Sequence, residues 1–133
     1  SDISWEGHEL TLVDCGGLEA KPGPAVRRKI REQVDRAVAE ADLVLFMVDA
    51  SAPLCTEDLE LYASLGDAAR IVVQNKIDLA AHSDLTAMDA YFSAVRTVRI
   101  SARNHTGLSG LYDAVYSHIM GDAAEVGSGG VRP

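Results

Sequence analysis

Residues 43–48 read LVLFMV, an unbroken apolar run that includes β-branched and aromatic side chains. A strand with one face in water alternates apolar and polar residues, whereas a strand covered on both faces stays apolar throughout. We therefore predict a strand at residues 43–48 that is covered on both faces. This restricts the chain to folds in which a sheet carries layers on both sides.

Shorter apolar runs and amphipathic segments alternate on either side of this strand. Further strands are predicted at residues 10–13 (LTLV), 71–73 (IVV) and 97–100 (TVRI). Apolar residues at helical spacing predict helices at residues 26–41, from a capping Thr56 to Leu65, at 84–95, and from Leu108 to Ile119, where Gly121 is placed to end the helix. This order predicts an α/β fold with a mainly parallel sheet in three layers.

Composition fits one globular domain of 133 residues with a net charge of −8, which argues against a general surface for coating nucleic acid. Half of the 12 basic residues nevertheless cluster in one short stretch: Lys21, Arg27, Arg28, Lys29, Arg31 and Arg36. Two interpretations stay open, a solvated helix face or a docking surface for an acidic partner or RNA.

Two cysteines, Cys15 and Cys55, form neither a disulfide framework nor a metal knuckle, which favours a reduced, cytoplasmic compartment. No apolar run approaches the roughly 20 residues of a membrane span, and the N-terminal residues do not resemble a signal peptide. We therefore predict a cytoplasmic protein without a membrane span.

Polar clusters directly follow three of the predicted strands. These clusters are Asp14, Cys15, Gly16 and Gly17 after the first strand, Asn75, Lys76 and Asp78 after the third, and Ser101, Ala102 and Arg103 after the fourth. Ligands of parallel α/β sheets bind beyond the carboxyl ends of the strands. We therefore expect the three clusters to share one edge of the sheet.

The NKID cluster has the chemistry of a guanine site. Guanine offers two adjacent donors, N1–H and N2–H₂, which one carboxylate, Asp78, can accept as a bidentate pair. Asn75 can donate to the base and tie neighbouring loops together, while the alkyl stem of Lys76 can lie over the ring. Ser101 and Ala102 suit a tight loop with a backbone N–H facing the base O6. The alternative is that NKID is only a polar strand-to-helix turn.

The DCGG cluster would serve the phosphate half of such a site. Asp14 can hold Mg²⁺ through water, because Mg²⁺ keeps several waters and takes few protein oxygens. Gly17 can bring its backbone N–H to a terminal phosphate without a Cβ in the way. Loss of that phosphate would release the loop, so a switch is predicted here.

The order D-x-x-G, N-K-x-D, S-A-x resembles the translation-factor-related GTPases, the Era, EngA and TrmE type. LTLVDCGGLE and KIREQVDRAVAEADLVLFMVDA look most like the first G domain of the Der (EngA) family of ribosome-assembly GTPases. The MnmE (TrmE) family of tRNA-modification GTPases is the next most similar. The resemblance covers about residues 1–120.

This resemblance implies binding of GTP and GDP, slow hydrolysis, Mg²⁺ and a conformational switch. It assigns guanine binding to Asn75, Lys76, Asp78, Ser101 and Ala102, with Arg103 in place of the usual lysine. It assigns Asp14, Cys15, Gly16 and Gly17 to the second switch and its phosphate, and Mg²⁺ to Asp14. Leu18 stands where some relatives have a water-orienting glutamine, so hydrolysis would need another group, such as a bound monovalent cation or a partner.

The phosphate-loop motif G-x-x-x-x-G-K-S/T does not occur in the sequence. We therefore expect a P-loop NTPase-like G domain that lacks its first strand, P-loop and first switch, with residues 1–120 as the partial G domain and 121–133 as a flexible tail. The missing strand would leave two apolar sheet edges exposed. The natural chain is then longer, which we favour, or the two edges pair directly, or another segment fills the gap.

Three functions are compatible with these patterns. The favoured one is the GTP-binding domain of a bacterial GTPase in ribosome assembly, with a ribosomal subunit or RNA as partner. The second is a tRNA-modification GTPase of the MnmE type. The third is a nucleotide-free pseudo-GTPase that acts as a scaffold through the helix of residues 25–40. GTP hydrolysis is predicted for the longer parent and stays open for these 133 residues alone.

Overall fold

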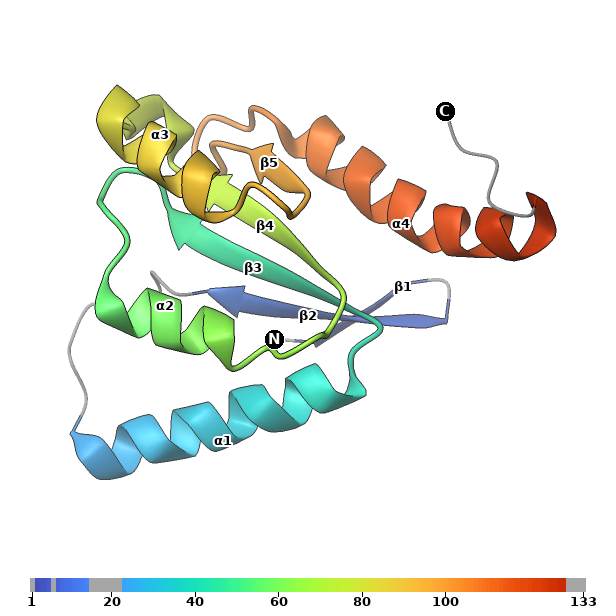
Figure 1. Cartoon of the computed structure of the whole chain (residues 1–133), viewed down its shortest axis with the longest axis horizontal. Helices are drawn as coiled ribbons and strands as arrows, with labels where there is room; N and C mark the ends of the chain where they lie inside the picture. Colours follow the sequence, from blue (N-terminus) through green and yellow to red (C-terminus); the bar gives the residue numbers. More distant parts are fainter. Residues whose placement is uncertain (1, 6, 15–22, 129–133) are drawn as a thin grey trace.

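The chain folds around a five-stranded sheet in the order β1-β2-β3-β4-β5 (Figure 1). The computed structural model describes residues 2–5, 7–14 and 23–128. The strands are β1 Asp2–Trp5, β2 His8–Asp14, β3 Leu43–Asp49, β4 Arg70–Asn75 and β5 Thr97–Arg99. β1 pairs antiparallel with β2, and every other pair is parallel. The predicted mainly parallel sheet is confirmed.

Helices cover both faces of the sheet. They are α1 Pro24–Glu40, α2 Thr56–Ala63, α3 His82–Tyr91 and α4 Leu108–Ser128. Side chains of α1, α2 and α3 pack on one hydrophobic cluster of the sheet, and those of α4 pack on the cluster of the opposite face. The three-layer α/β arrangement is therefore confirmed.

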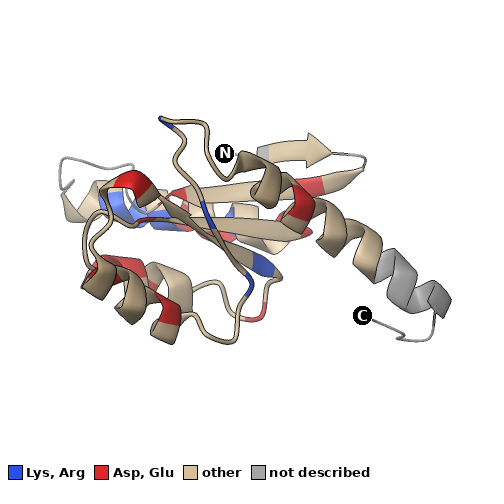
Figure 2. Ribbon diagram, turned by 90° about the horizontal axis from the view of Figure 1, so that it is seen from above, with Lys and Arg blue, Asp and Glu red and all other residues tan. Residues whose placement is uncertain are grey.

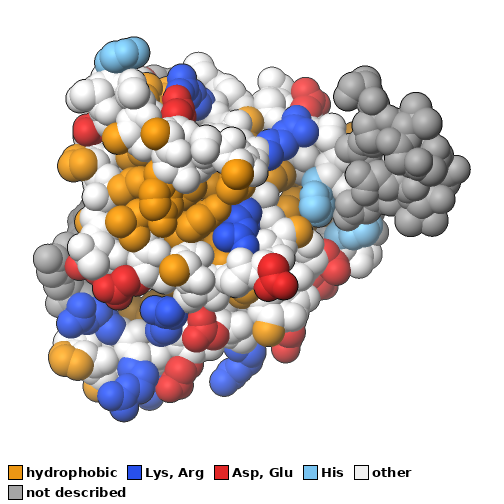
Figure 3. All heavy atoms as spheres, in the orientation of Figure 1, with side chains coloured by type: hydrophobic (Ala, Val, Ile, Leu, Met, Phe, Trp, Pro, Cys, Tyr) orange, Lys and Arg blue, Asp and Glu red, His pale blue; other side chains and the backbone are white. Residues whose placement is uncertain are grey.

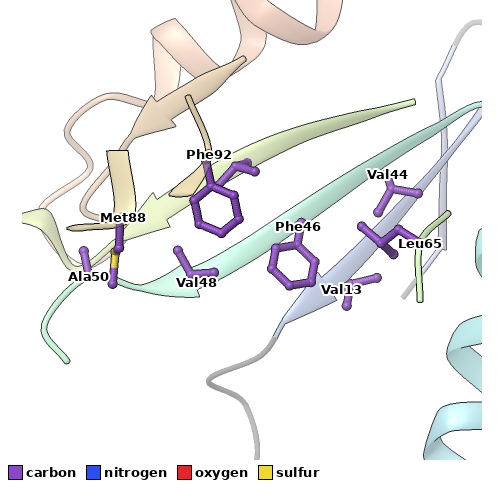
Figure 4. Packing of buried hydrophobic residues seen from close by; sticks show 9 residues of the cluster. Val13, Val44, Phe46, Val48, Ala50, Leu65, Met88 and Phe92 are labelled. Atoms are coloured by element: carbon purple, nitrogen blue, oxygen red, sulfur yellow. The ribbon is translucent and has the colours of Figure 1, made fainter. Parts of the chain in front are cut away.

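β3 contributes buried side chains to both faces of the sheet, as the unbroken run LVLFMV predicted. Val44, Phe46 and Val48 point into the cluster beneath α2 and α3 (Figure 4). Leu43 and Leu45 belong to the cluster beneath α4. Full burial of each such side chain stabilises the fold by about 1.5–3 kcal/mol, so this strand anchors both layers.

Aromatic side chains join β3 to two helices. The Phe46 ring lies 5.1 Å from that of Tyr62 on α2, and Tyr62 lies 4.9 Å from Phe92 at the end of α3, all edge to face. Such geometry suits the ring quadrupoles. Figure 3 shows that hydrophobic side chains also reach the surface between α2 and α3.

β2 and β3 pair directly, with Leu10 opposite Leu43 and Asp14 opposite Met47. Of the three ways to avoid exposed edges, direct pairing is the one found, so the expectation of two unpaired edges at this position is wrong. The physical reason is that unpaired backbone groups are costly, and two parallel strands of matching length can satisfy each other. The expectation of a longer parent chain is a separate prediction.

Several helix ends differ from prediction: α3 is His82–Tyr91 and not residues 84–95, and α2 ends at Ala63 and not at Leu65. Gly121 does not end α4, which continues to Ser128. One glycine costs a helix about 1 kcal/mol relative to alanine, and the strong helix formers Ala123 and Ala124 follow it. α2 begins at Thr56 with Cys55, rather than Thr56, as the capping residue, and the Asp58 carboxylate accepts the Cys55 N–H at 3.1 Å.

The α4 side of the sheet is only partly covered. A groove of about 470 Å³ lies between α4 and β1, β2 and β3. Its lining is apolar and includes Trp5, Leu12, Met47 and Tyr112. Tyr112 on α4 and Ile3 on β1 are 67% and 50% exposed. This face therefore presents apolar surface to water in the described structure.

Candidate guanine-nucleotide site

Three strand ends meet at the carboxyl edge of the sheet. Asp49 of β3 lies opposite Asn75 of β4, and Asp14 ends the neighbouring strand β2. A small cleft of about 60 Å³ is lined by Asp14, Met47, Val48, Asp49, Asn75 and Lys76. As predicted, Asp14 and the NKID cluster therefore lie at the same edge of the sheet.

Asn75 ties the NKID loop to the loop that follows β5. Its side-chain oxygen Oδ1 accepts the backbone N–H of Lys76 at 2.8 Å and that of Ala102 at 3.1 Å. Its Nδ2 is 3.7 Å from the Met47 sulfur, which is a weak acceptor. The loop-tying role predicted for Asn75 is thus present, and the amide nitrogen keeps donor capacity for a base.

Backbone hydrogen bonds hold the same two loops together. The N–H of Ile77 donates to the carbonyl of Ile100 at 3.1 Å, and the N–H of Ile100 donates to the carbonyl of Gln74 at 2.8 Å. These bonds extend the contact between β4 and β5 past the end of the strands. The loops carrying NKID and SAR are therefore one rigid edge.

Lys76 adopts a left-handed backbone conformation, with φ 62° and ψ 37°. For a residue with a Cβ this costs about 1–2 kcal/mol. The hydrogen bonds of Asn75 and Ile77 on either side hold it there. Backbone strain of this kind concentrates at functional sites, so it is a pointer to function at Lys76.

Asp78 lies on a short 3-10 helix, Ile77–Leu79, directly after the strained residue. Its side chain is exposed, so the carboxylate is at the protein surface and not in the hydrophobic interior. An exposed carboxylate beside the joined loops is available to accept the two donors of a guanine edge.

The SAR loop turns tightly. Ser101 is wholly buried, its N–H donates to the carbonyl of Thr106 at 3.0 Å, and its hydroxyl accepts the N–H of Asn104 at 3.2 Å. Gly107 closes the loop with φ 78°, and a Cβ there would lie 2.1 Å from the carbonyl oxygen of Arg99. The predicted tight loop is found at this position.

These bonds refine the expectation for the base O6. The N–H of Ser101 faces Thr106, and the N–H of Ala102 is already donated to Asn75. A base oxygen would therefore share the Ala102 N–H with Asn75 or take the N–H of Arg103. Both Ala102 and Arg103 are exposed.

Asp49 is a site residue that the sequence reasoning missed. Its Oδ2 lies 3.1 Å from the Lys76 ammonium, while its Oδ1 accepts both the hydroxyl and the N–H of Ser51. Partial burial alone would raise the pKa of Asp49, but the bonds from Ser51 and Lys76 outweigh burial and lower it. The signal was present, because Asp49 directly follows the apolar run of residues 43–48.

A network of polar side chains, Gln74, Asp89 and Arg99, joins the elements that carry this edge. Gln74 of β4 is wholly buried; its Nε2 donates to Asp89 of α3 at 3.1 Å, and its Oε1 accepts from Arg99 of β5 at 3.0 Å. Arg99 and Asp89 also form an ion pair. Every polar atom of this amide is satisfied by charged partners, so the group fixes β4, β5 and α3 relative to one another.

Of the residues predicted for the phosphate half of the site, the structure describes only Asp14. Its side chain is exposed at the end of β2, while Cys15, Gly16, Gly17 and Leu18 lie outside the described residues. The described residues hold no group of three or more metal-ligating side chains. Asp14 lines the cleft together with Asp49, Asn75 and Lys76, and Asp49 is already paired with Lys76. The hard carboxylate oxygen of Asp14 fits Mg²⁺ that is otherwise held by phosphate and water.

The large groove beneath α4 does not compete as the nucleotide site. Its walls are almost entirely apolar, and it offers no set of donors or acceptors to read a base. The strand-end cleft is much smaller, but it has the polar groups. The polar lining therefore favours the cleft at the carboxyl edge of the sheet as the nucleotide site.

A three-layer α/β fold with these loops at the strand ends defines a nucleotide-binding domain of the GTPase class. The chain belongs to the 50S ribosome-binding GTPase family, whose model matches residues 1–76. The structure of Aquifex aeolicus Era bound to GDP and AlF4⁻ is similar, with a TM-score of 0.60 and 25% identity over 72% of this chain and 36% of that chain.

GTPases of two kinds, Der and MnmE, are similar to this chain in sequence. GTPase Der of Desulforudis audaxviator is 33% identical over 98% of this chain, and tRNA modification GTPase MnmE of Desulfotalea psychrophila is 36% identical over 86%. The chain spans only 30% and 25% of these two proteins. The similarity to the Der and MnmE groups noted from the sequence is confirmed.

Among the residues that the structure describes, no helix combines the length and apolar character needed to cross a bilayer.

Proposed function

We propose that this chain forms the guanine-recognition half of a G domain that binds GTP and GDP together with Mg²⁺. The observation that carries the proposal is the double hydrogen bond of Asn75 Oδ1, at 2.8 Å to Lys76 and 3.1 Å to Ala102. This bond brings the NKID and SAR loops to one edge, where both halves of a base pocket are needed.

The base would be selected by Asp78. Its carboxylate accepts N1–H and N2–H₂ of guanine, while adenine lacks this pair of donors and would leave the carboxylate unpaired. A site built on such hydrogen bonds discriminates by several kcal/mol, on the order of 10⁴-fold. Asn75 Nδ2 would donate to the base, and the Lys76 stem would cover one face of the ring.

The phosphate side of the proposal rests on the loop after β2. Asp14 would hold Mg²⁺ through water, and the backbone of Gly16 and Gly17 would approach the terminal phosphate. When bound, Mg²⁺ neutralises phosphate charge. Cys15 stands between these residues in the sequence, so the proposed second switch is residues 14–17.

GTP hydrolysis is proposed for the longer protein that we expect to contain this chain. We assign no catalytic residue in these 133 residues, because Leu18 has an apolar side chain that cannot orient water. A bound monovalent cation or a partner would supply that function.

Ribosome assembly is the role we propose, in the bacterial cytoplasm and with a ribosomal subunit or RNA as partner. The family description and the similarity to GTPase Der support it. A related fold, Era, has been solved with MgGDPNP and a segment of 16S ribosomal RNA. The exposed basic residues at the start of α1 (Figure 2), Arg27, Arg28, Lys29 and Arg31, suit phosphate groups of RNA.

tRNA modification is the second candidate. The specific observation in its favour is the 36% identity to MnmE over 118 residues, which is slightly higher than the 33% to Der. The two candidates share the guanine site and differ in the partner. Cosedimentation of the full-length protein with ribosomal subunits, compared with its effect on tRNA modification in a deletion strain, separates them.

Guanine binding is tested by titrating the chain with fluorescent GDP and fluorescent ADP in the presence of Mg²⁺. NMR shift mapping with millimolar GMP and AMP extends the range to weak binding. We expect guanine nucleotides alone to bind and to shift the amides of residues 75–78 and 101–103. Equal responses to the two bases, or shifts elsewhere only, would contradict the proposal.

A further inference from the structure

We propose that Asp49 is a positioning residue of the guanine site: it holds the Lys76 ammonium so that the lysine stem is already placed as one wall of the pocket before a base arrives. The inference deepens the proposed function and rests on it. It adds a residue of β3 to a site otherwise built from the end of β2 and the loops after β4 and β5.

The first observation is the geometry of the ion pair. Asp49 stands directly opposite Asn75 in the β3–β4 ladder, and the Ala50 N–H donates to the Asn75 carbonyl at 2.8 Å. The Asp49 carboxylate is thus fixed at the base of the NKID loop. From there its Oδ2 reaches the Lys76 Nζ at 3.1 Å.

The second observation is that the carboxylate is itself held. Its other oxygen accepts two hydrogen bonds from Ser51, the backbone N–H at 2.8 Å and the hydroxyl. The Asp49 side chain is 27% exposed, against 50% for Lys76. The rigid partner of the pair is therefore the carboxylate, and the lysine is the group whose motion it restricts.

The third observation is the strained backbone of Lys76, with φ 62°. From this backbone the side chain reaches Asp49 at the end of β3, as the ion pair shows. A long lysine side chain loses considerable rotamer freedom when it is ordered. If Asp49 removes that freedom in the free protein, the cost is not met again when a base binds.

The bonds to Ser51 and Lys76 outweigh partial burial and lower the pKa of Asp49, which shows that the site favours the charged carboxylate. An exposed ion pair contributes little to stability. A role in positioning therefore predicts a larger effect on base binding than on folding.

The first test needs no variant. NMR relaxation of the Lys76 Cε–Hε group in the free protein should show restricted motion, while the exposed Lys29 on α1 should show free rotation. If Lys76 is as mobile as Lys29, the proposal is overturned, whatever the protein binds.

The second test is a double-mutant cycle on GDP affinity. Asp49→Asn should weaken GDP binding about three- to tenfold, the range expected for ordering one long side chain, and Asp49→Glu should recover part of the loss. In a Lys76→Met background, Asp49→Asn should have no further effect. Asp35→Asn, which removes the exposed Arg31–Asp35 pair on α1, is the matched control and should leave affinity unchanged.

The outcomes distinguish failure of the proposed guanine binding from failure of the positioning role of Asp49. Absence of guanine preference in the unaltered chain overturns the proposed function and this inference with it. Guanine preference with the same affinity in Asp49→Asn as in Asp35→Asn overturns only the inference. A loss that persists undiminished in the Lys76→Met background also overturns it, because Asp49 would then act independently of Lys76.

Discussion

The side-chain oxygen of Asn75 lies 3.1 Å from the backbone nitrogen of Ala102, 27 residues further along the chain. The same oxygen accepts the N–H of Lys76 at 2.8 Å. One acceptor thus fixes two loops that come from the ends of two neighbouring parallel strands. Together with the backbone hydrogen bonds of Ile77 and Ile100, this contact joins a polar turn and a small Ser-Ala pair in a single edge.

Asn75→Ala should separate the two loops. The substitution leaves the N–H groups of Lys76 and Ala102 without their acceptor, so we expect the free energy of unfolding to fall by about 1–3 kcal/mol. Urea denaturation measures the loss, and hydrogen exchange at Ala102 should quicken.

The matched control is Asn75→Asp, which keeps the oxygen acceptor and loses the Nδ2 donor. It should retain slow exchange at Ala102 while weakening guanine binding. If Asn75→Ala leaves exchange at Ala102 unchanged, the loops are held by the backbone bonds alone.

Gly107→Ala should be strongly destabilising. Gly107 has φ 78°, and an added Cβ would lie 2.1 Å from the backbone carbonyl oxygen of Arg99. We expect a loss of about 2–4 kcal/mol in the free energy of unfolding, because the clash is with backbone that cannot move aside.

Gly66→Ala provides the comparison for Gly107→Ala. Gly66 also has a positive φ, 60°, but nothing lies within 4 Å of an added Cβ. Its cost should be about 1–2 kcal/mol, from the left-handed backbone alone. Equal losses for the two variants would show that close packing of the SAR loop is not what requires Gly107.

Arg99→Leu should destabilise the protein more than the double variant Gln74→Leu with Arg99→Leu. The single change leaves the buried Oε1 of Gln74 without a partner, which costs about 1–3 kcal/mol. The double change removes that buried polar group as well. Thermal or urea unfolding of the pair tests this, and additive losses would contradict the hydrogen-bonded network.

The open face beneath α4 should bind a hydrophobic dye in the folded state. Leu12→Glu should lower the fluorescence of bound anilinonaphthalene sulfonate, because Leu12 lines the apolar groove. Val26→Glu, at an apolar residue that is 52% exposed on α1 and outside the groove, should leave it unchanged. Equal dye signals from both variants would place the bound dye elsewhere.

Much of the fold follows from local pattern. The run LVLFMV predicted a strand covered on both faces, and Phe46 and Leu45 indeed pack on opposite sides. The polar strand ends predicted one rim because parallel strands must bring their carboxyl ends together. Periodicity is a local property, so it reports these features directly.

Other features depend on tertiary pairing and have no local pattern. The direct pairing of Leu10 with Leu43 joins segments 33 residues apart, and only the need to satisfy both strands decides it. The partners of Gln74 on α3 and β5 are equally non-local. The predicted helix end at Gly121 was wrong. Glycine ends many helices, but helix formers on its C-terminal side let α4 continue.

Asp49 was missed for a different reason. It belongs to the same rim as Asp14 and Asn75, but it stands alone at a strand end and not in a polar cluster. Asp49 directly follows the predicted strand of residues 43–48, so its place at the carboxyl edge could be predicted from the sequence. The left-handed conformation of Lys76 had no such signal, because lysine does not favour it.

The most direct test of the guanine site is the base preference of the Asp78→Asn variant. The change replaces one acceptor of the carboxylate with a donor, which matches the 2-oxo group of xanthine instead of the 2-amino group of guanine. Calorimetric titration with GDP and XDP, with Asp67→Asn as an exposed control outside the site, measures the preference. We expect Asp78→Asn to bind XDP better than GDP, while Asp67→Asn keeps the original order. An unchanged preference for GDP in Asp78→Asn would rule out Asp78 as the residue that selects guanine.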